Sequence, residues 1–439
     1  DGQLSAPVRP EVPALRPGGR YLLEAVVRTV KIGHPFTQGT ADSNEVWLEV
    51  RATSGGQAIG RSGGRAPDGE VDPWSHFVNA FVLDREGYRI DRRNPQDIFV
   101  PLYDHQIPPG AADVVHYLLE VPRGIREPVE VEVRLLFRKF DTTYVRHFQG
   151  AQFLGNDLPI TELARDRVAF PVAGGGEVAV GEPVAIPEWE RWNDYGIALL
   201  RKGTQGASKG ELRQAEETFL RVEGQGRPDG PLNLARVFLK EGRLEEAIAA
   251  LQRAADHDPP APPWSVLWFT GLVNEQNGVF DEAIRSFQAL VRLDTAETRS
   301  REFDFSQDYR LLNELGKTLF ERARQERGEE GRAAREEMLR EAAGWLRRVL
   351  ELEPENVTAH YNLALILDEI GETKGAEAHR ALHAKYRPDE NARDRAVTSA
   401  RLRYPAANHA AEAIVIYDLG RPGAYEVPAP PAEIAHAGG

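Results

Sequence analysis

The spacing of hydrophobic residues changes character part-way along the chain. Up to about residue 175, apolar and polar positions alternate, most clearly in Val129–Phe137 and Glu45–Arg51. Alternation places apolar side chains on one face of a strand and polar ones on the other. Further β-branched or aromatic runs, separated by Gly, Pro, Asp and Asn, lie at residues 21–30, 76–83, 98–103 and 114–121. This pattern predicts an antiparallel β-sandwich over residues 1–175.

A segment rich in Gly and Pro follows, and it predicts a linker over residues 176–188. From Trp189 the hydrophobic period becomes 3.6 residues, which indicates amphipathic helices. The two regions therefore predict a multidomain protein of the β + α class, with the β-sandwich first and a helical region after it.

The helical region repeats a pattern of small and bulky residues. One unit has Ala235 early in its first helix, Ala247 twelve residues later, then Leu251 and a closing Pro259. This spacing resembles the tetratricopeptide repeat, a helix pair of about 34 residues. Two other units keep the spacing, with their early small residues at Gly271 and Ala364. Two more, with small residues at Gly196 and Gly316, contain insertions, and the insertion after Gly316 covers the charged stretch Arg322–Arg335. We expect a superhelical array of about five repeats over residues 189–405.

Residues 406–439 form a tail of different composition. Within it, residues 413–419 are rich in β-branched and aromatic residues, which predicts a strand. Because a lone strand is unstable in water, we expect it to join the edge of the sandwich with Tyr417 facing inward. Residues 421–439 are rich in Pro, Ala and Gly, and we expect them to be disordered or loosely attached.

Composition narrows the classes of function. The net charge is −14 and basic residues are interleaved with acidic ones, which argues against nucleic-acid binding. No apolar run approaches the roughly 18 residues that a transmembrane segment needs. The sequence contains no cysteine, which excludes disulfides, thiolate zinc sites and C-x-x-C-H haem attachment within these residues. The only methionine is Met338, so we expect that a segment upstream of Asp1 is missing.

Several segments carry a resemblance to a known family. They are Gly33–Leu48, Leu83–Asp84, Arg92–Asn94, Tyr103–Gly110, Val115–Tyr117, Arg138–Asp141, Arg191–Gly196, Asp229–Ala235, Gly271–Asn277, Tyr361–Ala364 and Asn408–Ile414. Together they resemble the haem-free, C-terminal portion of bacterial multihaem c-type cytochromes that carry tetratricopeptide repeats. The resemblance covers most of the chain.

This resemblance implies an exported protein, periplasmic or extracellular, that works in electron transfer. Because the chain has no cysteine, haem c would have to be held by a partner or by a missing upstream segment. The segment Ile32–Pro35 resembles one that supplies an axial imidazole to haem iron, which makes His34 a possible haem ligand. The alternative is a turn histidine bonded to backbone.

Asparagines recur near the small residue of the first helices. Asn233 and Asn362 lie two residues before it, and Asn193 and Asn313 lie one position earlier. An amide on the concave face of a repeat array can donate to and accept from the backbone of a bound partner. Helix packing is the alternative role. Trp264, Trp268 and Phe269 could likewise anchor a partner or fill the core, and of these we select Trp268 as the candidate partner-binding residue.

Motifs for catalysis are missing from the sequence: there is no G-x-S-x-G, Walker loop, H-E-x-x-H or dinucleotide fingerprint. We therefore expect no enzymatic activity, although a hydrolase acting through Asp and Glu pairs is a third hypothesis. His360, His379 and His383 have a spacing that can hold zinc, but packing within the repeat is the alternative, and we expect no metal.

Two functional hypotheses remain. The first is a protein–protein interaction scaffold that binds a redox or haem-bearing protein. The second is an electron-transfer component in which His34 of this chain ligates haem.

Overall fold

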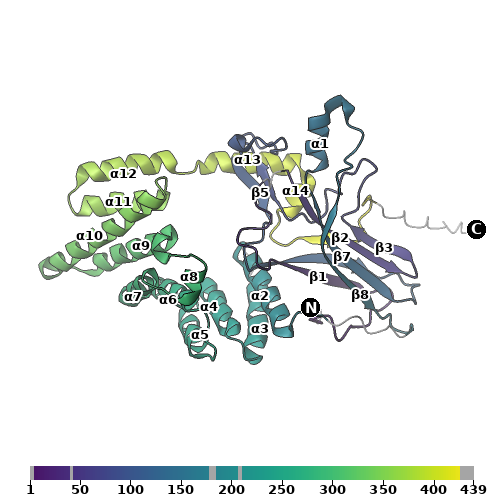
Figure 1. Ribbon diagram of the computed structural model, residues 1–439, viewed down its shortest axis with the longest axis horizontal. Coiled ribbons are helices and arrows are strands. Elements are labelled where there is room, and N and C mark those ends of the chain that lie inside the picture. The colour runs from purple at the N-terminus through teal and green to yellow at the C-terminus, as the bar shows by residue number, and fades with distance from the viewer. Residues whose placement is uncertain (1–3, 40–42, 177–183, 206–209, 426–439) are drawn as a thin grey trace, which may run out of the picture. The chain divides into compact units, whose positions relative to one another are not determined.

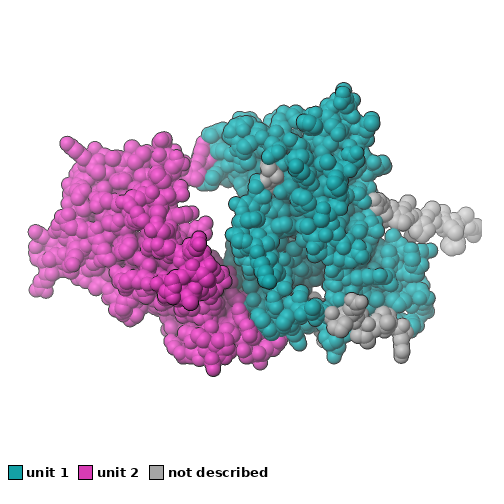
Figure 2. Space-filling model, viewed as in Figure 1, with its two compact units in different colours: residues 1–214, 390–439 teal, residues 215–389 magenta. Residues whose placement is uncertain are grey.

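The computed structural model describes residues 4–39, 43–176, 184–205 and 210–425. The chain divides into two compact units, coloured separately in Figure 2. Unit 1 comprises residues 1–214 and 390–439, and unit 2 comprises residues 215–389. The β-rich region followed by a helical region confirms the predicted fold class.

All strands belong to unit 1 (Figure 1). They are β1 (Arg20–Arg28), β2 (Glu45–Ser54), β3 (Gln57–Ser62), β4 (Ala80–Leu83), β5 (Val100–Asp104), β6 (Ala112–Glu120), β7 (Val129–Arg138), β8 (Thr161–Phe170) and β9 (Ile416–Asp418). They form sheets in the orders β1-β6-β9, β3-β2-β7-β8 and β4-β5. Each pairing is antiparallel except that of β6 with β9, which is parallel.

The two larger sheets share one hydrophobic core. Val50 of β2 and Val131 of β7 pack in the same cluster as Tyr117 and Leu119 of β6. Side chains from the inner faces of two sheets that meet in this way define a sandwich. Residues that alternate in the sequence thus supply the core, as the pattern predicted.

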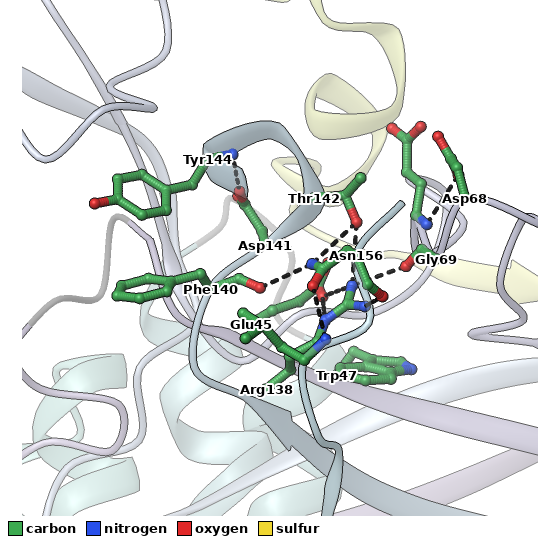
Figure 3. A network of polar contacts seen from close by, with 12 residues as sticks. Glu45, Trp47, Asp68, Gly69, Arg138, Phe140, Asp141, Thr142, Tyr144 and Asn156 are labelled. Carbon is green, nitrogen blue, oxygen red and sulfur yellow. Dashed lines mark hydrogen bonds and ion pairs between the residues drawn. The ribbon is translucent and has the colours of Figure 1, made fainter. Parts of the chain in front are cut away.

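A buried polar network supports the connection between β7 and β8 (Figure 3). Arg138 forms an ion pair with Glu45, and its guanidinium also donates to the carbonyl oxygen of Gly69 at 2.9 Å. Asn156 donates to Phe140 O at 3.1 Å and so closes the base of the loop that carries α1 (Thr142–Gln149). Burial raises the pKa of Glu45 to about 7 despite the opposing effect of Arg138. These contacts fix the base of the loop that carries α1.

Three further helices of unit 1 pack on the strands. They are α2 (Glu188–Gln205), α13 (Glu390–Arg403) and α14 (Pro405–Ala410), and unit 1 also contains the short η1 (Pro95–Asp97). Helix α2 lies against β6 and β1, and α13 and α14 lie against β5. The two compact units therefore divide at other positions than the predicted domain boundaries. The reason is that α2, α13 and α14, whose residues the sequence assigns to the repeat array or the tail, pack on the sheets of unit 1.

The tail returns to the sandwich. Strand β9 falls within the segment 413–419 for which the sequence predicts a strand, and it pairs with β6 through His116 to Leu118. Tyr417 is buried in the shared core, while Ile416 beside it is exposed. The end of the predicted loose segment, residues 426–439, lies outside the described residues.

Unit 2 is made of helix pairs. Its helices are α4 (Asp229–Glu241), α5 (Leu244–Asp256), α6 (Pro263–Gln276), α7 (Phe280–Val291), α8 (Ala296–Ser300), α9 (Tyr309–Gln325), α10 (Gly328–Leu352), α11 (Val357–Glu369) and α12 (Thr373–Tyr386), with α3 (Gly210–Gly224) crossing the division. The pairs α4/α5, α6/α7, α9/α10 and α11/α12 pack closely. The charged insertion predicted after Gly316 lengthens α9 and α10.

Small residues sit where two helices of a pair approach. A Cβ atom at Gly271 would lie 2.3 Å from Cε1 of Phe287, and one at Gly316 would lie 2.8 Å from Cγ of Leu346. Larger side chains at these positions would force the helices apart. In the described part of the chain, none of the helices is long and apolar enough to cross a membrane.

Candidate partner-binding surface

The first helices of adjacent repeats lie next to one another. Helix α4 contacts α6, and α9 contacts α11. In a stacked repeat array, the first helices line the concave side, where partners usually bind. Side chains of these helices that are not part of the core are therefore the candidates for partner binding.

One group is centred on Arg236 of α4. Its Nη1 donates to Oδ1 of Asn233 at 2.7 Å, and its guanidinium lies 5.6 Å from the ring centre of Phe269 on α6. No carboxylate of the described residues forms an ion pair with Arg236, and burial lowers the pKa of its guanidinium. The repeat array thus holds a half-buried cation whose contacts are an amide and an aromatic ring.

A second group joins α6 to α9. Nζ of Lys317 lies 2.6 Å from a carboxylate oxygen of Glu314 and 3.3 Å from one of Glu275. Burial opposes the charge on Lys317, but the two carboxylates more than offset this and raise its pKa. This cation, unlike Arg236, is already neutralised.

We call these residues the inner strip. Its members are partly exposed or nearly buried side chains on the first helices, and they are Asn233, Arg236, Phe269, Glu275, Glu314 and Lys317. Arg236 and Lys317 each directly follow the small residue of their repeat, Ala235 and Gly316. Their equivalent positions give the signal by which the sequence could have identified them.

The asparagines expected to bind a partner are mostly buried. Asn233 of the inner strip and Asn362 on α11 are both buried. Nδ2 of Asn313 donates to Oδ1 of Asn356 at 3.1 Å, and the same oxygen caps α11 by accepting from the backbone of Ala359. Asn193 lies half-buried on α2, in unit 1. Partner binding by these four residues stays a prediction.

The aromatic residue on the inner side is not Trp268. Trp268 is partly buried against the core, with its ring 5.8 Å from that of Phe287. Phe269, one position further along the same helix, contacts Arg236 instead. Adjacent residues on a helix point about 100° apart, so only one of the two can face the neighbouring first helix.

His34 lies on an exposed turn of unit 1. Its Nδ1 is 3.0 Å from the carbonyl oxygen of Pro35, which can only accept, so Nδ1 carries the proton. The lone pair is then on Nε2. A neutral imidazole in this tautomer has the nitrogen available that a metal ligand needs.

The three histidines of the last repeat form hydrogen bonds with one another and with backbone. Nε2 of His360 donates to Pro354 O at 3.0 Å, so its Nδ1 accepts from Nδ1 of His379 at 2.9 Å. Nδ1 of His383 donates to Val357 O at 3.2 Å. These bonds tie α12 to α11, and within the described residues no group of three potential ligands converges on a metal position.

Comparisons with known proteins agree with this architecture. A family model described as a tetratricopeptide repeat matches residues 200–262, 232–298 and 332–387. Tetratricopeptide repeats lie within residues 200–387. Tetratricopeptide repeats generally bind other proteins, so this chain carries a module of a protein-binding class. A search of curated proteins found no match.

Solved structures with similar folds include several of MamA. A MamA variant is 19% identical, with a TM-score of 0.32, and the match covers 45% of this chain and 97% of that one. MamA RS-1, as a double mutant, is 13% identical with a TM-score of 0.35, covering 46% and 96%. MamA AMB-1 is 18% identical with a TM-score of 0.31, covering 44% and 99%. Scores and identities this low define no function for the chain.

Proposed function

We propose that the chain is a non-catalytic interaction scaffold whose inner strip binds an extended, acidic segment of a partner protein. The observation that carries the proposal is Arg236. A half-buried guanidinium without a carboxylate beside it is costly, and a partner's carboxylate would supply the missing charge.

The neighbouring residues define the rest of the segment. Phe269 offers an apolar surface on α6, and the ion pair between Glu275 of α6 and Lys317 of α9 forms a polar edge beyond it. Neighbouring helices lie about 10 Å apart, so these three repeats span roughly 20 Å, or about six residues of extended peptide. The proposed ligand therefore has a carboxylate and an apolar side chain a few residues apart.

A peptide-display screen against the intact chain tests this proposal. Peptides with a carboxylate near an apolar side chain should be enriched, and Arg236→Gln should weaken their binding at least tenfold, about 1.4 kcal/mol. Arg285→Gln is the matched control, because Arg285 lies on a second helix and pairs with Glu282 of its own helix. Equal binding by the two variants, or enrichment of basic peptides, would contradict the proposal.

The sequence resemblance adds a more specific proposal: the partner is a haem-bearing, extracytoplasmic protein or the chain's own upstream segment. Purified alone, the chain should show no Soret band near 400 nm, since it lacks the cysteines for thioether attachment. A Soret band that persists through purification would contradict this.

A second candidate function is supply of an axial haem ligand by His34. It is favoured by the exposed ring and by the lone pair on Nε2. After mixing with a multihaem partner, His34→Ala should shift the Soret band and potential of one haem, whereas exposed His147→Ala should not. Identical spectra for the two variants would remove this candidate.

A further inference from the structure

Strand β1 is the end strand of the sheet β1-β6-β9. Its nine residues pair with β6 along one side only, and the sheet ends at the other side. An end strand presents a row of backbone donors and acceptors to its surroundings. The question is which residues present them and what covers them.

The hydrogen-bond pattern identifies these residues. Val121 N donates to Gly19 O and Thr29 N donates to Ala111 O, both at 2.9 Å, so odd-numbered residues of β1 bond to β6. In an antiparallel ladder the intervening residues direct N–H and C=O the other way. These are the even-numbered residues Leu22, Glu24 and Val26, and among the described residues no backbone group pairs with theirs.

The same edge exposes aliphatic side chains. Leu22 is 51% exposed, Val26 is 40% exposed, and Val30, just beyond the strand, is 50% exposed. The other long end strand, β8, carries charged side chains at Glu162 and Arg165. Charges of this kind protect an edge against pairing, but on β1 the charged residues Arg20, Glu24 and Arg28 alternate with the exposed Leu22 and Val26, so a partner strand has to match both kinds of residue.

We propose that two copies of this chain associate by antiparallel pairing of β1 with β1 of the second copy, about a two-fold axis at Val26. This register places Val26 opposite Val26 and Leu22 opposite Val30, so the exposed aliphatic residues cover one another. It also places Glu24 opposite Arg28. Opposite charges across strands are favourable, and aliphatic pairs add to the stability.

Other registers are poorer. An axis at Glu24 would place Glu24 opposite itself and Arg20 opposite Arg28, which opposes like charges. An axis at Leu22 would place Val26 opposite Gly18 and leave Val30 without a partner. The register about Val26 is thus the one that covers all three exposed aliphatic side chains.

The side chains of Glu24 and Arg28 also have partners within their own copy. Tyr195 donates to Glu24 at 2.8 Å, and Nη1 of Arg28 lies 2.9 Å from a carboxylate oxygen of Asp194 on α2. These contacts fix the two side chains on the face of the sheet covered by α2. The seam therefore forms mainly through backbone hydrogen bonds and the aliphatic pairs.

Cysteine cross-linking tests the register directly, because the natural chain has no cysteine. Under mild oxidation Val26→Cys should form a disulfide-linked dimer by itself. Leu22→Cys and Val30→Cys should each stay uncross-linked alone and form a dimer when mixed. Leu163→Cys is the control, since Leu163 is 44% exposed on β8. It should cross-link at least tenfold more slowly than Val26→Cys.

Sedimentation of the unmodified chain provides the second measurement. Its mass should double with increasing concentration, and Leu22→Lys with Val26→Lys should keep it monomeric without loss of the folded signal. A monomer at every concentration, or cross-linking of Leu22→Cys alone, would overturn the proposal. So would a monomer that binds a peptide copying residues 20–30, because the edge would then accept a strand other than a second copy.

Discussion

Gly271 and Gly344 are both helical glycines, yet their surroundings differ. A Cβ at Gly271 would overlap the ring of Phe287, whereas one at Gly344 on α10 would meet no atom within 4 Å. Gly271→Ala should therefore lower the free energy of unfolding by about 1–3 kcal/mol through overpacking. Gly344→Ala should raise it by about 0.5–1 kcal/mol, since alanine favours a helix. Denaturant unfolding of the two variants checks both signs, and equal effects would refute the close approach of α6 and α7.

His76 gives unit 1 a dependence on pH. Its ring is buried between His105, at 4.9 Å between ring centres, and Tyr417, whose hydroxyl lies 3.2 Å from Nδ1. Burial lowers its pKa well below the usual range; His105 and Lys202 add to this and Asp113 opposes it. In the unfolded chain His76 binds a proton near pH 6.5, whereas in the folded chain it does so only at lower pH. The free energy of unfolding therefore falls as the pH falls below about 6.5.

Replacement of His76 isolates this effect. Relative to His76→Gln, the natural chain should lose up to about 1.4 kcal/mol of unfolding free energy per pH unit between about pH 6.5 and 5.5. Exposed His147→Gln should follow the natural chain. Unfolding midpoints in denaturant at several pH values measure the difference, and parallel curves for all three proteins would contradict the prediction.

Strand β9 places neighbouring residues in opposite environments. Tyr417 is 4% exposed and packs among Tyr117, His76 and His409, whereas Ile416 is 42% exposed. Tyr417→Ala should lower the free energy of unfolding of unit 1 by about 3 kcal/mol, and Ile416→Ala by less than about 1 kcal/mol. Denaturant unfolding followed by tryptophan fluorescence measures both. Similar small losses would mean that β9 does not contribute to the core.

The composition of a single element predicted whether it is a strand or a helix, but not which other elements it packs against. The strand near Tyr417 could be predicted because β-branched and aromatic residues favour strands. Its parallel pairing with β6 could not, because an edge accepts either direction. Likewise the helical period of α2 and α13 shows that an apolar face exists, but not whether a helix or a sheet covers it.

The candidate site shows the same limit. The recurring asparagines were visible in the sequence, yet burial of Asn362 and the bond from Asn313 to Asn356 depend on neighbouring helices. Arg236 could not be predicted from the sequence, because its lack of a carboxylate partner is a property of the folded array. A charged residue that follows the small residue of a repeat is the sequence signal to look for.

At the scale of the whole molecule, unit 1 is completed by residues on both sides of unit 2 in the sequence. The C-terminal part contributes β9, and His105 bonds to the carbonyl oxygen of Ala410 at 3.1 Å. Removal of residues 408–439 should therefore increase the rate at which proteases cleave unit 1, because the core around Tyr117 opens. Limited proteolysis followed by mass spectrometry measures this. An unchanged pattern of fragments would show that unit 1 is complete without the tail.

The return of β9 to β6 also has a consequence for the time course of protein synthesis. Strand β6 ends at Glu120 and its partner begins at Ile416, so the ribosome adds about 300 residues between them. At roughly 5–20 residues per second this takes about 15–60 s. Throughout that interval the nascent chain carries β6 with one unpaired side, and Tyr117 lacks the ring that later covers it. A cell that makes this protein must keep that nascent edge from pairing with other chains until β9 has emerged from the ribosome.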